Sequence, residues 1–398
     1  MKNKLYRSIG ISVSSSYIFF AINFLGQLVL VRLLRPEDFG VFALVMSISA
    51  MIDLFVSFSI PMAYIKERET ESLFKSACFL SLVVGFLPLL VSSVAYFPLS
   101  HHYDPKIAQY LLIVTLTKPF FSLSAIMIAS VEKKAQFGKS YLLAGLSMSS
   151  SLVIAISLAY LGFDEISLIV REVLRGVILF FIVKAYLRIP LSFSFDKSEI
   201  KRLLSFSSKM ILSRGSEVGY FKIPFLLIGS TFGTVTLGYF SQAFYLVSLV
   251  STALNPITEK VAFVFYSQME RSKHNFRTIN IIILSISFPI SIALFTFPGE
   301  IISTIYGDKW LESSEYVRYL AIFGFVLPFF NNHKSFLYSE GLNNIVTVAY
   351  LFSLCLLIYL LHIDLLVYAY PASIAFGLFI FFLVKIYKNP TNTGDGKG

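Results

Sequence analysis

Charged side chains interrupt several long apolar stretches of this sequence, and these residues carry most of its chemistry. The basic ones are Lys118, Arg171, Arg175, Arg214, Lys222 and Arg318, and the acidic ones are Asp53, Glu172 and Glu217. A charge at the centre of a membrane helix costs roughly 2.5–3.5 kcal/mol on insertion scales, so it is expected to pair or to face a water-filled cavity. Cations outnumber carboxylates here, which predicts a cavity that receives an anion. Arginine favours phosphate because its planar fork donates two parallel hydrogen bonds.

The spacing of these residues groups them further. Arg171 and Arg175 are one helical turn apart and share a face, and Arg214 and Glu217 are close enough to pair. Pairing within the chain is the simpler interpretation for any single residue, but the carboxylates are too few to neutralise every cation. We therefore expect the carboxylates to hold or release cations that line the anion site. The expected cations are Arg171, Arg175, Arg214, Lys222 and Lys118, and the expected carboxylates are Asp53, Glu172 and Glu217.

The sequence carries no motif of covalent catalysis or of metal binding. It has no HExxH element, no P-loop and no phosphate-cradling glycine run. Cys78 and Cys355 lack CxxC spacing, and the histidines have no partner at metal-ligand spacing. We therefore predict no catalytic residue, no metal site and no cofactor.

Composition predicts a chain that is solvated by lipid. Hydrophobic residues make up 56% of the chain and charged residues 14%, and the mean hydropathy is +0.75. Soluble domains carry roughly 25% charge. The net charge of +10 lies in short clusters between apolar runs, as in the loops of membrane proteins, and this distribution argues against a nucleic-acid partner.

Apolar stretches long enough to cross about 30 Å of hydrocarbon predict an all-α integral membrane protein with twelve transmembrane helices. They cover roughly residues 11–34, 39–64, 76–97, 107–130, 140–161, 165–187, 208–230, 235–258, 278–298, 315–336, 343–361 and 365–386. We expect a six-helix lobe over 1–187, a cytoplasmic amphipathic linker over 188–207, a second six-helix lobe over 208–386 and a disordered cytoplasmic tail over 387–398. Two such lobes would be related by a pseudo-two-fold axis along the membrane normal.

The loop charges predict that both termini are cytoplasmic. Most loop lysines and arginines then lie inside, and only Arg32, Arg35, Lys106 and Lys309 lie outside. In the linker, Asp196 and Glu199 have capping-box spacing, and the apolar residues that follow alternate with Lys201 and Arg202. This pattern predicts a short amphipathic helix on the inner leaflet.

A helical hairpin recurs in the two halves of the chain. Pro36 ends one apolar run, and Glu37 or Asp38 can cap the next helix. Gly40 aligns with Gly238, which suggests a duplicated unit. Trp310 and Tyr306, in a short outer loop, are typical of residues at the headgroup level.

These elements resemble the Wzx-type flippases that move O-antigen and exopolysaccharide units, in the superfamily that also holds MATE drug exporters and the lipid II flippase. The resembling stretches are 31–43 (VRLLRPEDFGVFA), 129–141 (ASVEKKAQFGKSY), 203–206 (LLSF), 237–243 (LGYFSQA) and 305–311 (IYGDKWL). The resemblance implies a MATE-like two-lobed fold that alternates between inward-open and outward-open states. It also implies that Arg32, Asp53, Arg214 and Lys222 lie near the substrate path.

The resemblance implies a substrate, a polyprenyl-diphosphate-linked oligosaccharide, whose negative charge suits the excess of cations. The expected setting is the bacterial inner membrane, among membrane lipids, with a polysaccharide polymerase and a chain-length regulator as possible partners in O-antigen, capsule or exopolysaccharide synthesis. A multidrug exporter is an alternative, but cationic drugs would require an acidic cavity. A membrane polymerase or ligase is another, although such enzymes usually have a substantial outer loop, and a scaffold would leave the buried cations unexplained.

Overall fold

The described part of the chain is helical. The computed structural model describes residues 2–56, 60–67, 70–134, 136–188, 191–255, 258, 266, 273–340, 342–362 and 365–387. These residues form fourteen α-helices and a short 3-10 turn and contain no strand, so the predicted all-α class is confirmed. Six of the helices are long and apolar enough to cross a membrane. All of the expected tail except Tyr387 lies outside the described residues.

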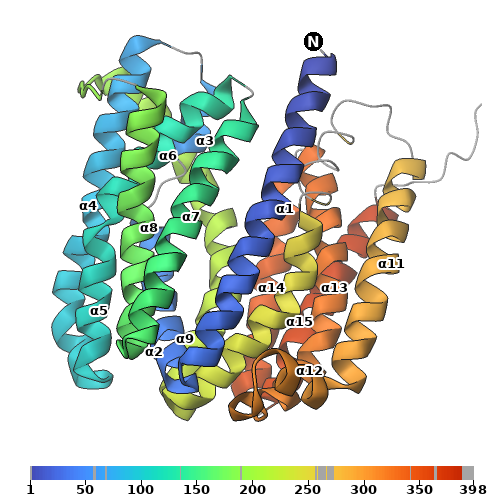
Figure 1. Cartoon of the computed structure of the whole chain (residues 1–398). Helices are drawn as coiled ribbons and strands as arrows, with labels where there is room; N and C mark the ends of the chain where they lie inside the picture. Colours follow the sequence, from blue (N-terminus) through green and yellow to red (C-terminus); the bar gives the residue numbers. More distant parts are fainter. Residues whose placement is uncertain are drawn as a thin grey trace, which may run out of the picture. The chain divides into compact units, whose positions relative to one another are not determined.

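The chain divides into two compact units (Figure 1). Unit 1 comprises residues 1–242 and 299–313, and unit 2 comprises residues 243–298 and 314–398. Unit 1 holds α1 (Lys2–Leu33), α2 (Pro36–Val56), α3 (Ile60–Lys66), α4 (Glu71–His102), α5 (Pro105–Leu116), α6 (Lys118–Lys133), α7 (Phe137–Tyr160), α8 (Asp164–Leu187), the first part of α9 (Lys197–Asn255), all but the first residue of α12 (Pro298–Ile305), and η2 (Asp308–Trp310). Unit 2 holds the rest of α9 with α11 (Lys273–Thr296), α13 (Ser313–Ser339), α14 (Asn343–His362) and α15 (Leu366–Tyr387). The expected six-helix lobes remain a prediction.

The predicted span over 107–130 is two helices, α5 and α6, that meet at Thr117. Pro119 lies in the first turn of α6, where its missing N–H leaves no hydrogen bond unmade. The Thr117 hydroxyl donates to the Val114 carbonyl at 3.0 Å, which satisfies an oxygen at the end of α5. The break places Lys118 at the start of α6, inside an otherwise apolar stretch.

Element α9 has 59 residues and consists of two helical segments on either side of a kink at Gly233. The first segment holds the predicted amphipathic helix and the predicted span 208–230, and the second begins the predicted span 235–258. The one non-helical residue of α9 is Gly233, with φ 84° and ψ 174°, a conformation that residues with a side chain rarely adopt. The expected separate linker helix is therefore the first turns of α9. These turns are amphipathic, since Leu203 and Ser207 are buried while Lys201 and Arg202 are exposed.

The segment before α9 lies against the start of α4. The Ser72 hydroxyl donates to Asp196 Oδ2 at 3.0 Å, and the Phe195 ring meets the Phe79 ring edge-on. Asp196 also caps α9, because its Oδ1 accepts hydrogen bonds from the backbone N–H and the hydroxyl of Ser198. The hydroxyls of Ser198 and Ser72 and this N–H lower the pKa of Asp196. The capping role predicted from the sequence is confirmed.

The two aligned glycines of the sequence repeat lie at a direct contact between α2 and α9. A Cβ added at Gly40 would lie 1.7 Å from the Thr234 carbonyl oxygen, and one added at Gly238 would lie 1.8 Å from the Pro36 oxygen. The two backbones touch, so neither position has room for a side chain. The two glycines that align between the halves of the sequence therefore pack α2 against α9 within unit 1.

The segment formed by α12 and η2 packs on the end of α1 and the start of α2. The Trp310 indole N–H donates to the Val31 carbonyl at 2.9 Å, and the Trp310 ring packs edge-on against Phe39 and Tyr239. Trp310 is fully buried and Tyr306 is 1% exposed. The expectation that both side chains anchor the chain by contact with lipid headgroups is therefore wrong, because the protein itself surrounds them.

Unit 2 has an aromatic core and a buried polar patch. Phe244, Phe323 and Tyr370 pack against one another with ring centroids 5.1–5.4 Å apart. On α13, Asn331 donates to the Ser251 hydroxyl at 3.0 Å, and Asn332 donates to Asn280 Oδ1 at 2.9 Å. These amides join α13 to α9 and α11 through hydrogen bonds buried among apolar side chains.

We expect Gly40→Ala and Gly238→Ala each to lower the apparent thermal midpoint of the purified protein. The added methyl group would overlap a backbone oxygen, and such overpacking costs about 1–3 kcal/mol. Gly215→Ala is the matched control, because a Cβ there has no atom within 4 Å and an alanine suits a helix interior. Equal midpoints for all three variants would contradict the close contact.

Candidate anion-binding site

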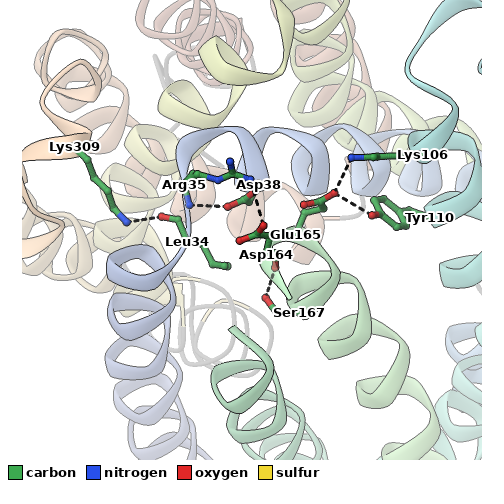
Figure 2. Close-up of polar contacts among 9 residues, drawn as sticks. All are labelled: Leu34, Arg35, Asp38, Lys106, Tyr110, Asp164, Glu165, Ser167 and Lys309. Carbon is green, nitrogen blue, oxygen red and sulfur yellow. Dashed lines mark hydrogen bonds and ion pairs between the residues drawn. The ribbon is translucent and has the colours of Figure 1, made fainter. Parts of the chain in front are cut away.

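Four helices of unit 1, α2, α6, α8 and α9, carry charged residues at different depths. Helices α2, α5 and α8 all begin at one end of unit 1, where Arg35, Asp164, Glu165 and Lys106 interact (Figure 2). At about 1.5 Å per residue, Glu172 and Arg175 lie roughly 12 and 16 Å along α8, and Asp53 lies roughly 26 Å along α2. These depths fall inside a hydrocarbon layer of about 30 Å.

Lys118 forms an ion pair with Asp53. The Lys118 ammonium donates to Asp53 Oδ2 at 2.6 Å, and the side chains are 17% and 27% exposed. The other carboxylate oxygen, Asp53 Oδ1, is buried and has no hydrogen-bond partner among the described residues. The pair therefore joins α2 to α6 and retains an unused acceptor.

Glu172 lies between two cations. Its carboxylate accepts a hydrogen bond from the Arg175 guanidinium one turn along α8, and it interacts electrostatically with Lys222 of α9. The Lys222 ammonium also lies 5.4 Å from the centre of the Phe225 ring. Glu172 further interacts, as a like charge, with Asp53. The four helices thus share one connected charge cluster, which we define as Asp53, Lys118, Glu172, Arg175, Arg214 and Lys222.

Arg214 enters this cluster through a cavity of about 460 Å³ that it lines together with Asp53. It is exposed and makes no hydrogen bond or ion pair with any described residue, although Glu217 is near it in sequence. Glu217 is half-buried on α9. Arg214 is thus a cluster cation whose charge is available to a ligand.

A second, small cavity of about 30 Å³ lies between α5, α6 and α8. Its polar lining is Lys118, Glu172, Arg175 and Thr117. Arg175 Nε is buried and unpartnered among the described residues, and its guanidinium carbon lies 5.7 Å from the centre of the Phe121 ring. Phe121 lines both this small cavity and the larger one.

Arg171 makes a different contact, which the sequence did not indicate. Its Nη1 donates to Gln27 Oε1 at 2.9 Å, and Gln27 Nε2 lies 3.5 Å from Gln242 Oε1. Both glutamines are buried, at 7% and 5% exposure. The available signal was a glutamine within an apolar span, which needs a hydrogen-bond partner in a membrane.

Arg32 lies apart from the charge cluster. Its guanidinium donates to the carbonyls of Thr304 and Ile305 at 2.6 and 3.2 Å, and Lys309 donates in return to the carbonyls of Arg32 and Leu34. These bonds hold the α12 segment on the end of α1. Burial lowers the pKa of Lys309, and the nearby Asp38 charge opposes that shift.

The four cations assigned to the outer side all have partners at this end of unit 1. Asp38 accepts from the Arg35 backbone N–H at 2.7 Å and from its guanidinium at 3.2 Å, so Asp38 closes the first turn of α2 (Figure 2). Burial raises the pKa of Asp38 even so, because its side chain is only 2% exposed. Glu165 accepts from the Tyr110 hydroxyl at 3.0 Å and lies 3.7 Å from the Lys106 ammonium. These carboxylates sit at helix N-termini, where negative charge is favourable.

The charge cluster has more cations than carboxylates, so an anionic ligand would compensate its excess positive charge. It contains Lys118, Arg175, Arg214 and Lys222 against Asp53 and Glu172, a formal excess of two positive charges. Among the described residues no group of three acidic, histidine or cysteine side chains could hold a metal ion. The arrangement therefore favours an anionic ligand of about two charges.

This helical architecture and buried charge define a multi-pass membrane protein with the fold of MATE transporters and lipid II flippases. It is similar to the lipid II flippase MurJ in an inward closed conformation, with a TM-score of 0.71 and 16% identity over 94% of this chain and 87% of MurJ. An outward-facing multidrug resistance MATE family transporter gives a TM-score of 0.67 at 15% identity, covering 97% of both chains. At such identities the likeness concerns the fold.

Residues 29–315 match the profile of a family described as polysaccharide biosynthesis protein, and the chain belongs to that family. The teichuronic acid biosynthesis protein TuaB of Bacillus subtilis (strain 168) is 29% identical over 38% of this chain and 32% of TuaB. The succinoglycan biosynthesis transport protein ExoT of Rhizobium meliloti (strain 1021) is 23% identical over 79% of this chain and 65% of ExoT. The aligned region thus spans less than two thirds of either relative. The family match thus places the chain among polysaccharide biosynthesis proteins.

We expect Asp53→Asn to lower stability by about 1–3 kcal/mol, because it leaves the half-buried Lys118 ammonium without its charged partner. The double variant Asp53→Leu/Lys118→Met should lose less stability than Asp53→Leu alone or Lys118→Met alone, since it removes both charges together. Thermal unfolding of the single and double variants measures the coupling between the residues. Additive losses would show that the pair contributes no coupling.

Proposed function

We propose that this protein moves a polyprenyl-diphosphate-linked oligosaccharide from the inner to the outer leaflet of the bacterial cytoplasmic membrane. The product would serve the synthesis of O-antigen, capsule or exopolysaccharide. Membership of a polysaccharide biosynthesis family supports a saccharide-linked substrate. The observation that carries the mechanism is the net positive charge cluster in unit 1, because a diphosphate must cross the hydrocarbon with its charge compensated.

In this proposal Arg175, Arg214, Lys222 and Lys118 receive the diphosphate, and no covalent step takes place. Asp53 and Glu172 hold Lys118 and Arg175 when the site is empty. The entering phosphate oxygens then replace these carboxylates as partners of the cations. Such an exchange keeps each cation paired, which limits the cost of burying it.

The proposal also includes the remaining residues, the topology and the partners that were predicted from the sequence. Arg171 and Glu217 belong near the path, while Arg32 supports the α12 segment that closes one end of unit 1. We propose the two-lobed arrangement of twelve spans with both termini cytoplasmic. A lipid-linked oligosaccharide and membrane lipids are the proposed partners, with a polysaccharide polymerase and a chain-length regulator acting on the product.

A transport assay also tests two alternative functions, a multidrug exporter and a membrane polymerase or ligase. A multidrug exporter of the MATE type shares the fold, but the net positive charge of the cluster would repel cationic drugs. A membrane polymerase or ligase would act on the same sugars, and it would convert a lipid-linked oligosaccharide instead of moving it. Transport without change of the substrate distinguishes our proposal from the second alternative.

The test is transfer of a fluorescent short-chain polyprenyl-diphosphate sugar to the far leaflet of proteoliposomes. We expect Arg214→Gln to slow this transfer by roughly ten-fold to a hundred-fold, the equivalent of one charge-assisted hydrogen bond to phosphate. Arg214 makes no ion pair with the described residues, so its loss should leave the fold intact.

Lys139→Gln is the matched control, because Lys139 is an exposed cation at the start of α7, outside the cluster. Its transfer rate should equal that of the unaltered protein. Unchanged transfer in an Arg175→Gln/Arg214→Gln double variant of normal thermal stability would discard the site assignment. Release of a polymerised product would favour the polymerase.

A further inference from the structure

The larger cavity is lined by Asp53 and Arg214 of the charge cluster and otherwise mainly by apolar side chains. Its apolar lining comes from α2, α3, α4, α6 and α9, namely Ala50, Leu54, Ile60, Pro61, Met62, Val84, Phe121, Ala125 and Val218. The remaining lining residues are Asp53, Arg214, Ser81 and Ser122. At about 460 Å³ it falls within the range of roughly 300–1,000 Å³ that is typical of small-molecule sites.

We infer that this cavity binds the prenyl units next to the diphosphate of the substrate, an inference that rests on the proposed function. A ligand with an apolar body and an anionic head matches the two kinds of lining. The cavity would thus select for the lipid carrier, while the sugar lies elsewhere.

The two charged residues of the lining, Asp53 and Arg214, indicate where the diphosphate end of the ligand would bind. Asp53 connects the cavity to Lys118 through their ion pair, and the Arg214 charge lies on the same cavity without an ion-pair partner among the described residues. Phe121 also lines the small polar cavity that contains Lys118 and Arg175. In this inference the diphosphate contacts Arg214 and replaces Asp53 as the partner of Lys118, while the chain attached to it enters the apolar space.

Other ligand classes fit this lining less well. A free sugar would need several hydrogen-bonding side chains, but the apolar residues dominate the walls. A cationic amphiphile would be repelled by Arg214, and the lining carboxylate, Asp53, is already paired with Lys118. Serine hydroxyls at 81 and 122 are the other polar groups in the lining, and hydroxyls of this kind are compatible with an alkene chain.

The experiment compares binding of inorganic pyrophosphate and of geranyl diphosphate to the full chain in nanodiscs. Each buried CH₂ group is expected to raise affinity about four-fold, so burial of even part of the ten-carbon chain predicts at least a ten-fold gain for the prenyl ligand. Isothermal titration calorimetry measures both affinities directly.

Ala125→Phe fills the cavity without changing a charged residue. We expect it to reduce the affinity for geranyl diphosphate to that for pyrophosphate, with pyrophosphate binding unchanged. Ala50→Phe, on the facing helix α2, tests the same space if the first variant is unstable. Ala185→Phe is the control, because Ala185 is exposed on α8 and lies outside this lining.

The outcomes separate this inference from the proposed function. Equal affinities for the two ligands in the unaltered protein would overturn the prenyl cavity and leave the diphosphate site standing. A prenyl gain that Ala125→Phe and Ala50→Phe leave intact would also overturn it, because the chain would then bind the bilayer or another surface. Binding of geranyl diphosphate that both variants remove, without any binding of pyrophosphate, would support the prenyl cavity and overturn the charge cluster as the diphosphate site.

Discussion

The backbone contact between α2 and α9 is the constraint on which the charge cluster depends. At Gly40 and Gly238 the two chains approach so closely that only hydrogen atoms fit between them. Asp53 lies 13 residues after Gly40, and Lys222 lies 11 residues before the bend at Gly233. At about 1.5 Å per residue, Asp53 lies roughly 20 Å along α2 from Gly40, and Lys222 lies roughly 16 Å along α9 from Gly233. Gly233 directly precedes Thr234 of the contact, so the crossing of the two helices constrains both positions. A side chain at either glycine would separate the helices and with them the charges.

The electrostatics of the cluster follow from how few carboxylates it contains. Asp53 and Glu172 each hold a cation at hydrogen-bond distance. Two of the four cations of the cluster, Lys118 and Arg175, are therefore neutralised within the protein. Arg214 and Lys222 remain as the charge excess, and both lie on α9. A ligand that compensates them thus acts on the helix that continues from unit 1 into unit 2.

Much of the fold could be predicted from the sequence, because apolar length is a direct physical requirement of a membrane. The spans over α7, α8, α14 and α15 agree with the observed helices to within three residues. The break at Thr117 was missed, since a proline indicates an interruption without giving its size. The boundary predicted between the spans 208–230 and 235–258 coincides with the kink at Gly233. Asp196 was correctly predicted as a helix cap because its partners are its neighbours in sequence.

The site was harder to predict, because its contacts join distant positions. Lys118 and Asp53 are 65 residues apart, and Arg171 and Gln27 are 144 apart. Charge inside apolar spans identified the participants, but not the partner of each. Arg32 shows the limit of this reasoning: its type suits an anion, yet backbone carbonyls of the α12 segment occupy it. Trp310 shows a second limit. An aromatic residue in a loop is typical of the membrane interface, but the sequence does not show that this loop folds against the helices and buries the ring.

The α12 segment has a consequence for how the chain is made. Trp310 bonds to Val31 across 279 residues, so this end of unit 1 stays incomplete until the ribosome has synthesised most of the protein. At roughly 5–20 residues per second, that interval lasts on the order of 15–60 s. During it, the Val31 and Leu34 carbonyls lack their later donors, and Phe39 lacks the indole that covers it. The nascent membrane protein therefore carries an unfinished, partly apolar corner through most of its insertion, a period in which insertion factors or quality-control proteases can act on it.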